Sequence, residues 1–230
     1  KYNDVSLIVK KTENLGSDAA KITYGISSVY RSSGDALQAI NYLNKTNNYD
    51  RVKLNYNIIL KNYAEIKQIL SVNLNESFSS VQYYYPRSYY QGIFNYGFGN
   101  KADSRKYFNS TIIHLKEKIN EYPDDPRFYS ALGLTYARLG KKIDAINAGL
   151  KAVEILPVSK DALFGTIYEK SLSSIYSIVG EKNKALEKIE YLSIIPNGFH
   201  YGELLSDPVF DSIRDEPRFQ SVLNKLKLSL

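Results

Sequence analysis

The 230-residue sequence contains no cysteine, no methionine and no tryptophan, and its only histidines are His114 and His200. The absence of cysteine excludes disulfides, thiolate metal sites and cysteine nucleophiles, and it leaves the redox compartment open. Neither histidine belongs to a His-Glu-x-x-His pattern or has a second ligand four positions away. No nucleophile-elbow or phosphate-loop motif occurs either. We therefore expect no catalytic, cofactor-binding or metal-binding residues, and no enzymatic activity, in this chain.

Long apolar runs are also missing. No stretch approaches the roughly 18 apolar residues that suggest a membrane-spanning helix, and the beginning of the chain has no apolar segment of signal-peptide length. We therefore expect no membrane span and a cytoplasmic location. The chain starts at Lys1 without methionine, which favours a fragment whose native N-terminus, with another domain or a targeting segment, lies upstream.

The residues that are present predict an all-α fold. Hydrophobic residues make up 43% of the chain, enough to fill a core. Apolar side chains recur at helical spacing, as in Phe128, Leu132 and Tyr136, whereas strict alternation over strand lengths is scarcely seen. Short breaks rich in Gly, Pro, Asn and Asp separate the expected helices. Residues 103–122 and 159–180 are each expected to form one long helix.

A period of about 40 residues runs through the chain. A glycine in an expected turn is followed five positions later by a small residue, and these small residues lie 41 and then 40 positions apart. The pairs are Gly99 with Ser104, Gly140 with Ala145, and Gly180 with Ala185. Regular repetition of helix pairs predicts an array in which each unit packs on its neighbours.

The clearest unit resembles the tetratricopeptide repeat (TPR). It matches the repeat pattern at six of seven positions: Tyr129, Leu132, Gly133, Tyr136, Ala145 and Pro157, with Gly149 as the departure. An aromatic residue is usual at that seventh position, so a neighbouring helix must fill the space beside Gly149. The resemblance implies a right-handed α-solenoid of TPR-like helix-turn-helix repeats with a C-terminal capping helix. We expect degenerate repeats over 1–125, two clearer repeats over 126–196 and the cap over 197–230, all in one continuous solenoid.

The longer helices and the tail at 204–226 are similar to TPR regions in bacterial multidomain signalling proteins, including serine/threonine kinases and class III nucleotide cyclases. This resemblance implies a non-catalytic protein–protein interaction scaffold or sensor module in the C-terminal part of such a protein. The expected partner is a protein or peptide. A further hypothesis is that the chain contacts an upstream domain or a second copy of itself.

The middle of the chain carries the surplus charge. Residues 51–120 hold ten Lys/Arg against four Asp/Glu, and nine of the 21 tyrosines. Because Tyr and Arg are favoured at interfaces, this segment and the inner-face positions of the clearer repeats supply the candidate partner-binding surface. Its members are Tyr85, Arg87, Tyr89, Tyr90, Tyr96, Arg127, Ser130, Arg138, Lys170 and Ser174. The same segment supports an alternative function, a nucleic-acid-binding helical array, although nucleic acid is not the partner we expect. A third interpretation is that the tyrosines are filler in the core.

Three other patterns favour structural roles. The run Gly97-Phe98-Gly99-Asn100-Lys101-Ala102 matches a dinucleotide fingerprint, but an expected helix rather than a strand precedes it. The stretches DDPRF at 124–128 and DEPRF at 215–219 are interpreted as helix starts with proline in the first turn. Acidic residues of the tail, such as Glu203 and Asp207, would need burial in a cleft to act as acid/base pairs, and we interpret the acids before prolines as helix starts.

Overall fold

The computed structural model describes residues 19–45 and 49–228, with side chains from Tyr24 onward. The described part is mostly helical and adds one two-stranded antiparallel hairpin, which agrees with the predicted all-α class. The elements are α2 (Ala19–Ser33), α3 (Ala36–Leu43), α4 (Asp50–Ile59), α5 (Tyr63–Val72), β1 (Ser77–Ser79), β2 (Tyr84–Pro86), α6 (Arg87–Gly97), α7 (Lys101–Glu121), α8 (Pro126–Arg138), α9 (Lys142–Ile155), α10 (Gly165–Ile178), α11 (Lys182–Leu192), α12 (Tyr201–Ser206), the 3₁₀ helix η2 (Pro208–Phe210) and α13 (Pro217–Leu228).

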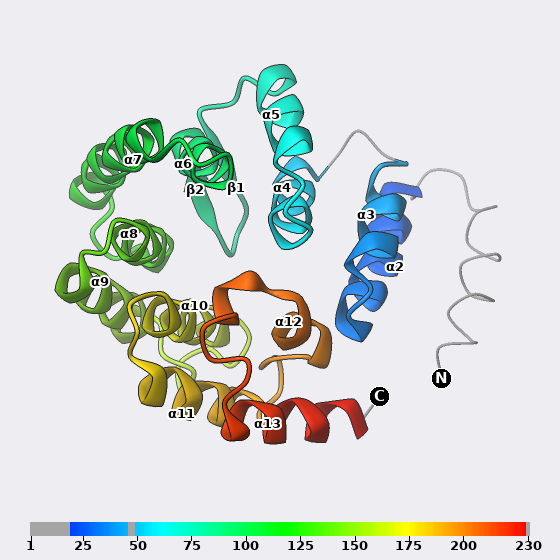
Figure 1. Cartoon of the computed structure of the whole chain (residues 1–230). Helices are drawn as coiled ribbons and strands as arrows, with labels where there is room; N and C mark the ends of the chain where they lie inside the picture. Colours follow the sequence, from blue (N-terminus) through cyan, green and yellow to red (C-terminus); the bar gives the residue numbers. More distant parts are fainter. Residues whose placement is uncertain (1–18, 46–48, 229–230) are drawn as a thin grey trace.

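Helices that are consecutive in the chain pack as pairs, and the pairs follow one another in an arc (Figure 1). Helices α4, α6, α8 and α10 lie on the inner side of the arc, and α5, α7, α9 and α11 lie on the outer side. The C-terminal segment then turns inward, where α12 contacts both α2 and α13, while α13 contacts α11. The segment expected to cap the end of the array therefore also occupies its interior.

The turns within the pairs share one backbone conformation. The turn glycines have positive φ of 92°, 77°, 75° and 79° at Gly34, Gly99, Gly140 and Gly180. Glycine adopts this left-handed conformation without the steric cost that a side chain brings, and it ends a helix there. The small residue five positions later is at most 3% exposed in each pair: Ala39, Ser104, Ala145 and Ala185. The spacing observed in the sequence thus corresponds to a recurring turn and a recurring helix contact.

Close helix crossings explain the small residues Gly133 and Gly149. A Cβ atom on Gly133 would lie 3.0 Å from the backbone oxygen of Ala145 and 2.7 Å from Cδ1 of Ile175. A Cβ atom on Gly149 would lie 2.7 Å from the same Ile175 atom and 2.9 Å from Cδ1 of Leu172. The prediction that a neighbouring helix fills the space beside Gly149 is therefore confirmed, since both filling side chains come from α10.

Two local predictions were wrong. The hairpin was not foreseen. In it Phe78 pairs with Tyr85 across the two strands. The Ser80 hydroxyl accepts hydrogen bonds from the backbone N–H groups of Gln82 and Tyr83, which favours a turn over a helix. The long helix expected over 159–180 begins only at Gly165. Asp161 accepts from the backbone N–H groups of the two residues before that glycine and forms a turn there.

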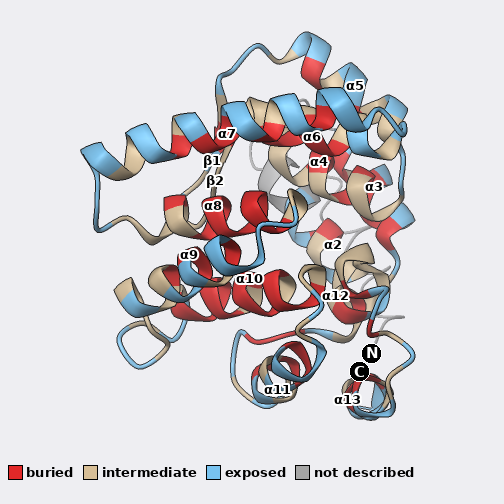
Figure 2. Ribbon diagram, turned by 60° about the vertical axis from the view of Figure 1, so that its left-hand side comes forward, coloured by how far each residue is buried: buried red, intermediate tan, exposed pale blue. Residues whose placement is uncertain are grey.

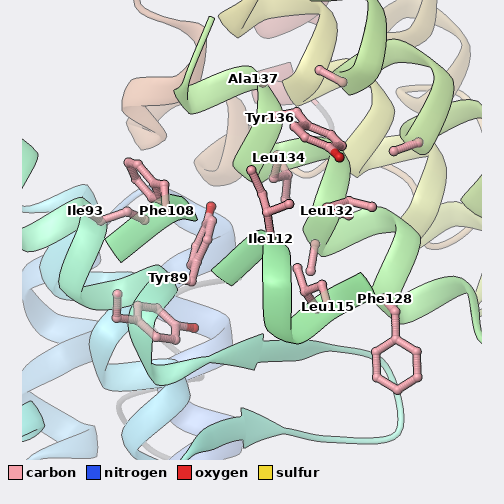
Figure 3. Close-up of a cluster of buried hydrophobic side chains, with 14 of the residues drawn as sticks. Tyr89, Ile93, Phe108, Ile112, Leu115, Phe128, Leu132, Leu134, Tyr136 and Ala137 are labelled. Atoms are coloured by element: carbon pink, nitrogen blue, oxygen red, sulfur yellow. The ribbon is translucent and has the colours of Figure 1, made fainter. Parts of the chain in front are cut away.

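The core runs continuously from one pair to the next. Figure 2 shows that α7 exposes its outward side and buries the side that faces α6 and α8. In Figure 3, Tyr89 and Ile93 of α6, Ile112 of α7, and Phe128 and Leu134 of α8 belong to one cluster. Each helix pair therefore buries its apolar surface against its neighbours, which makes the array cooperative.

Both proline-containing stretches begin helices, as predicted. Pro126 occupies the first turn of α8, where Asp125 accepts a hydrogen bond from the Arg127 backbone N–H at 3.0 Å. Pro217 is the first residue of α13. The following phenylalanines, Phe128 and Phe219, are 4% and 0% exposed. Proline fits the first helical turn because its missing N–H would have no partner there.

Candidate functional site

A partly open cavity of about 260 Å³ lies on the inner side of the arc. Side chains from α2, α4, β2, α6, α8, α10 and the C-terminal segment line it, so regions more than 170 positions apart meet there (Figure 1). Its charged lining consists of four cationic and two acidic side chains, which leaves an excess of two positive charges. These are Arg31, Arg51, Arg138, Lys170, Glu203 and Asp207.

A row of tyrosines forms one wall. Tyr83 stacks on Tyr85 with ring centroids 6.2 Å apart, and Tyr85 stacks on Tyr89 at 4.9 Å. Tyr83 and Tyr85 are two positions apart at strand β2, so their side chains point the same way, and Tyr89 follows in the first turn of α6. Burial raises the pKa of all three hydroxyls, which therefore stay protonated near neutral pH. The wall consequently presents neutral hydrogen-bond donors.

Guanidinium groups lie at both ends of this row. Arg51 of α4 lies over the Tyr83 ring, with 4.6 Å between its Cζ and the ring centroid. At the other end, Arg138 of α8 lies beside Tyr89, and its positive charge opposes the rise that burial causes in the Tyr89 pKa. The Nε of Arg138 is buried and has no hydrogen-bond partner among the described residues. The two guanidinium groups therefore lie beside aromatic side chains, and neither forms an ion pair with an acidic side chain of the described residues.

The C-terminal segment inserts a carboxylate between two cations. Glu203 of α12 forms ion pairs with Lys170 of α10 at 2.9 Å and with Arg31 of α2. Burial alone would raise the pKa of Glu203, but the attraction of Arg31, Lys170 and His200 outweighs it and lowers the pKa from 4.5 to about 2. Burial also lowers the pKa of Lys170, and Glu203 opposes that effect. The carboxylate is thus strongly held in its charged form.

Asp207 is the second acid of the segment. Its carboxylate accepts a hydrogen bond from the Val209 backbone N–H at 2.9 Å, which caps η2 as the sequence predicted for an acid before Pro208. Burial raises the pKa of Asp207, against the opposing effect of that hydrogen bond and of Arg138. The interpretation of Asp207 as a helix start is confirmed, but the position also places an acid at the cavity.

The structure brings five of the ten candidate residues together. Tyr85, Tyr89, Arg138, Lys170 and Ser174 all line the cavity. Sequence reasoning did not select Arg31, Arg51, Tyr83, Glu203 and Asp207 for the site. Arg51 and Tyr83 were within the basic, tyrosine-rich segment, whereas nothing in the local sequence pointed Glu203 toward Lys170.

The other five candidates lie elsewhere, and two of them are corrections. Tyr90 is 0% exposed and its hydroxyl donates to Asn55, while Ser130 is 5% exposed within α8, so neither belongs to an accessible surface. Both are buried because they lie on the side of their helix that packs against other elements. Arg87 donates to backbone carbonyls at the end of α5. Arg127 pairs with Asp125 at 2.6 Å, and Tyr96 is 58% exposed, away from the cavity.

The remaining patterns have local roles in the described ranges. The fingerprint-like run lies between α6 and α7, with Gly99 at the turn, so a helix precedes it as expected. His114 contacts the Tyr84 hydroxyl at 2.6 Å, and His200 precedes α12 as its N-cap. Over 19–45 and 49–228, no three His, Asp or Glu side chains gather at metal-binding distance. Among the helices in these ranges, none has the length and apolar character needed to cross a bilayer.

The comparisons with known proteins supply no relative. No family model matches the chain, and neither a curated protein nor a solved structure matches it.

Proposed function

We propose that the chain is a right-handed solenoid of TPR-like helix pairs that serves as a non-catalytic protein-interaction scaffold or sensor module. In this proposal it forms the C-terminal part of a larger bacterial signalling protein and binds a protein or peptide on the inner side of its arc. The recurring turn glycines and the close crossing at Gly133 support the repeat assignment.

One observation carries the binding proposal. The inner side already holds a peptide segment, the chain's own residues 199–210, through the ion pairs of Glu203 with Lys170 and Arg31. Phe199 adds a contact, since the Lys170 ammonium lies 5.3 Å from its ring centroid. A surface that accommodates an acidic, partly aromatic segment in cis has the chemistry to accept a similar segment from a partner.

The test uses the full chain and a labelled peptide of residues 199–210, FHYGELLSDPVF. In the Glu203→Gln chain the internal segment is weakened, so we expect this variant to bind the peptide at least tenfold more tightly than the original chain does. Fluorescence anisotropy measures the affinity. A peptide with Gln in place of its Glu, and a chain with Lys170→Gln in addition, should both lose most of the binding. Equal binding of the Glu and Gln peptides, or no binding by any variant, would contradict the proposal.

The nucleic-acid alternative has less support in the basic segment. Single-stranded nucleic acid needs exposed aromatic faces along a cationic groove. Tyr89 and Tyr90 are instead buried, and the Arg87 guanidinium donates hydrogen bonds to backbone carbonyl groups. An oligonucleotide titration at two salt concentrations separates the two functions, because phosphate contacts predict an affinity that falls steeply as salt increases.

A further inference from the structure

The cationic groups of the cavity are not all matched by acids. The Glu203 carboxylate already forms ion pairs with Lys170 and Arg31. Arg51 forms no ion pair with any described residue, and its guanidinium lies over the Tyr83 ring. Arg138 keeps a buried Nε without a partner in the same part of the chain. Because Arg51 has no acidic partner among the described residues, its guanidinium can form charge-assisted hydrogen bonds with an anion that enters the cavity.

Neutral donors accompany these charges. The hydroxyls of Tyr83 and Tyr85 have no hydrogen-bond partner within 19–45 and 49–228, and burial keeps them protonated. A phenol that remains protonated donates a hydrogen bond to a carboxylate or phosphate oxygen. The stacked rings also offer an apolar wall for the body of a ligand. The wall and the charges together suit a molecule with an anionic group and a flat or short apolar part.

The size and access of the cavity limit the ligand. Its volume of about 260 Å³ lies just below the range of roughly 300–1,000 Å³ that is typical of small-molecule sites, so it suits a small organic acid. A second depression of about 710 Å³ shares Tyr24, Arg51, Val52 and Gln82 with it and opens on the side of the hairpin. Arg51 therefore stands where the outer depression meets the inner cavity, a position from which it can contact an entering anion.

We propose that the cavity binds a small organic anion, whose carboxylate or phosphoryl group pairs with Arg51 and accepts hydrogen bonds from the Tyr83 and Tyr85 hydroxyls, while its body lies against the stacked rings. This site is distinct from the protein-binding proposal, because Arg51 forms no ion pair with the internal acidic segment, whose Glu203 pairs with Lys170 and Arg31. A sensor module with such a site would respond to the concentration of a metabolite-sized acid.

The test is calorimetric titration of the full chain with benzoate, succinate and inorganic phosphate at constant ionic strength, with benzamide as the neutral analogue of benzoate. We expect saturable binding of at least one anion, a rise in melting temperature, and no binding of benzamide. A carboxylate that binds while phosphate does not assigns the site to organic acids, and the reverse assigns it to phosphoryl groups.

Variants place the binding in the cavity. Arg51→Gln should weaken the binding of the anion at least tenfold, whereas Arg105→Gln, on the exposed side of α7, should leave the affinity unchanged. If a Gln variant loses its helical circular dichroism, Arg51→Lys serves instead, because it keeps the charge and loses the planar donor pair. Failure of all three anions to saturate, equal binding of benzamide and benzoate, or an equal loss in Arg105→Gln would overturn the proposal.

Discussion

The helix pairs from α8 to α11 and the cavity wall formed by α4, the hairpin and α6 belong to the same array, yet they fill their inner spaces in opposite ways. In the first region, Gly133, Ala145 and Gly149 let backbones approach until Ile175 occupies the remaining space. In the second region, large tyrosines and arginines hold the elements apart, and a cavity remains between them. Side-chain size therefore decides whether the space between neighbouring elements is filled or left open, even though α8 and α10 also contribute side chains to the cavity.

The two regions are also stabilised by different kinds of interaction. The close crossings are stabilised by apolar burial and packing, which depend little on pH or salt. The cavity is held together by the ion pairs of Glu203 with groups from α2 and α10, which depend on protonation. Substitutions and pH changes should therefore act on the two regions differently.

The largest effect is expected for Glu203→Gln. The substitution leaves the Lys170 ammonium, 18% exposed, without its carboxylate, and it removes the link to Arg31. Breaking a buried ion pair in this way should lower the free energy of unfolding by about 3 kcal/mol, measured by urea denaturation. The control is Glu190→Gln: its pair with Arg218 has side chains 41% and 43% exposed, so about 0–1 kcal/mol is expected. Equal losses in the two variants would remove the distinction between buried and exposed pairs.

The free energy of unfolding should depend on pH through the protonation of the Glu203 carboxylate. Its pKa falls from 4.5 to about 2 on folding, because the attraction of the neighbouring cations exceeds the effect of burial. The folded state thus binds this proton more weakly than the unfolded state, and the contribution is complete above pH 4.5 and lost as the pH falls toward 2. Urea midpoints between pH 7 and pH 3 should decline more steeply for the original chain than for Glu203→Gln. Parallel curves would be evidence against a role for Glu203.

A smaller loss is expected from overpacking the close crossing. Ala145 is 0% exposed and lies where α8 and α9 meet, so Ala145→Leu should force the helices apart. The expected cost is about 1–3 kcal/mol, measured as a shift in thermal or urea melting. The matched control is Ala102→Leu, at an exposed position of α7, where the larger side chain meets solvent. Unchanged stability in Ala145→Leu would contradict the assigned contact.

The smallest effect concerns a turn. Gly140 has φ of 75° and open space beside it, so Gly140→Ala should cost about 1 kcal/mol through backbone strain alone. The same substitution at Gly25, inside α2 with no atom within 4 Å of a Cβ, should stabilise by about 0.5 kcal/mol. Urea denaturation should give changes in the free energy of unfolding of opposite sign for the two variants. Changes of the same sign would show that φ does not decide the outcome.

Much of the fold could be predicted from local patterns, while the site could be predicted only in part. Pro126 and Pro217 start helices because proline suits the first turn regardless of what packs nearby. The hairpin was missed because a three-residue strand gives too short an alternation to detect. Tyr85 and Tyr89 were found by composition, and composition also selected Tyr90, whose side chain points into the core instead.

The sequence by itself determined the helical class, the turn glycines, the small residues at crossings and the absence of thiol chemistry, because each depends on residues within a few turns of one another. Only the tertiary structure decided that Arg31 meets Glu203 across 172 positions, and that Arg51 and Arg138 face one cavity. Such meetings depend on how all the helix pairs are arranged together, which no single helix pair specifies. The chemistry of the inner side is therefore a property of the closed arc rather than of any motif within it.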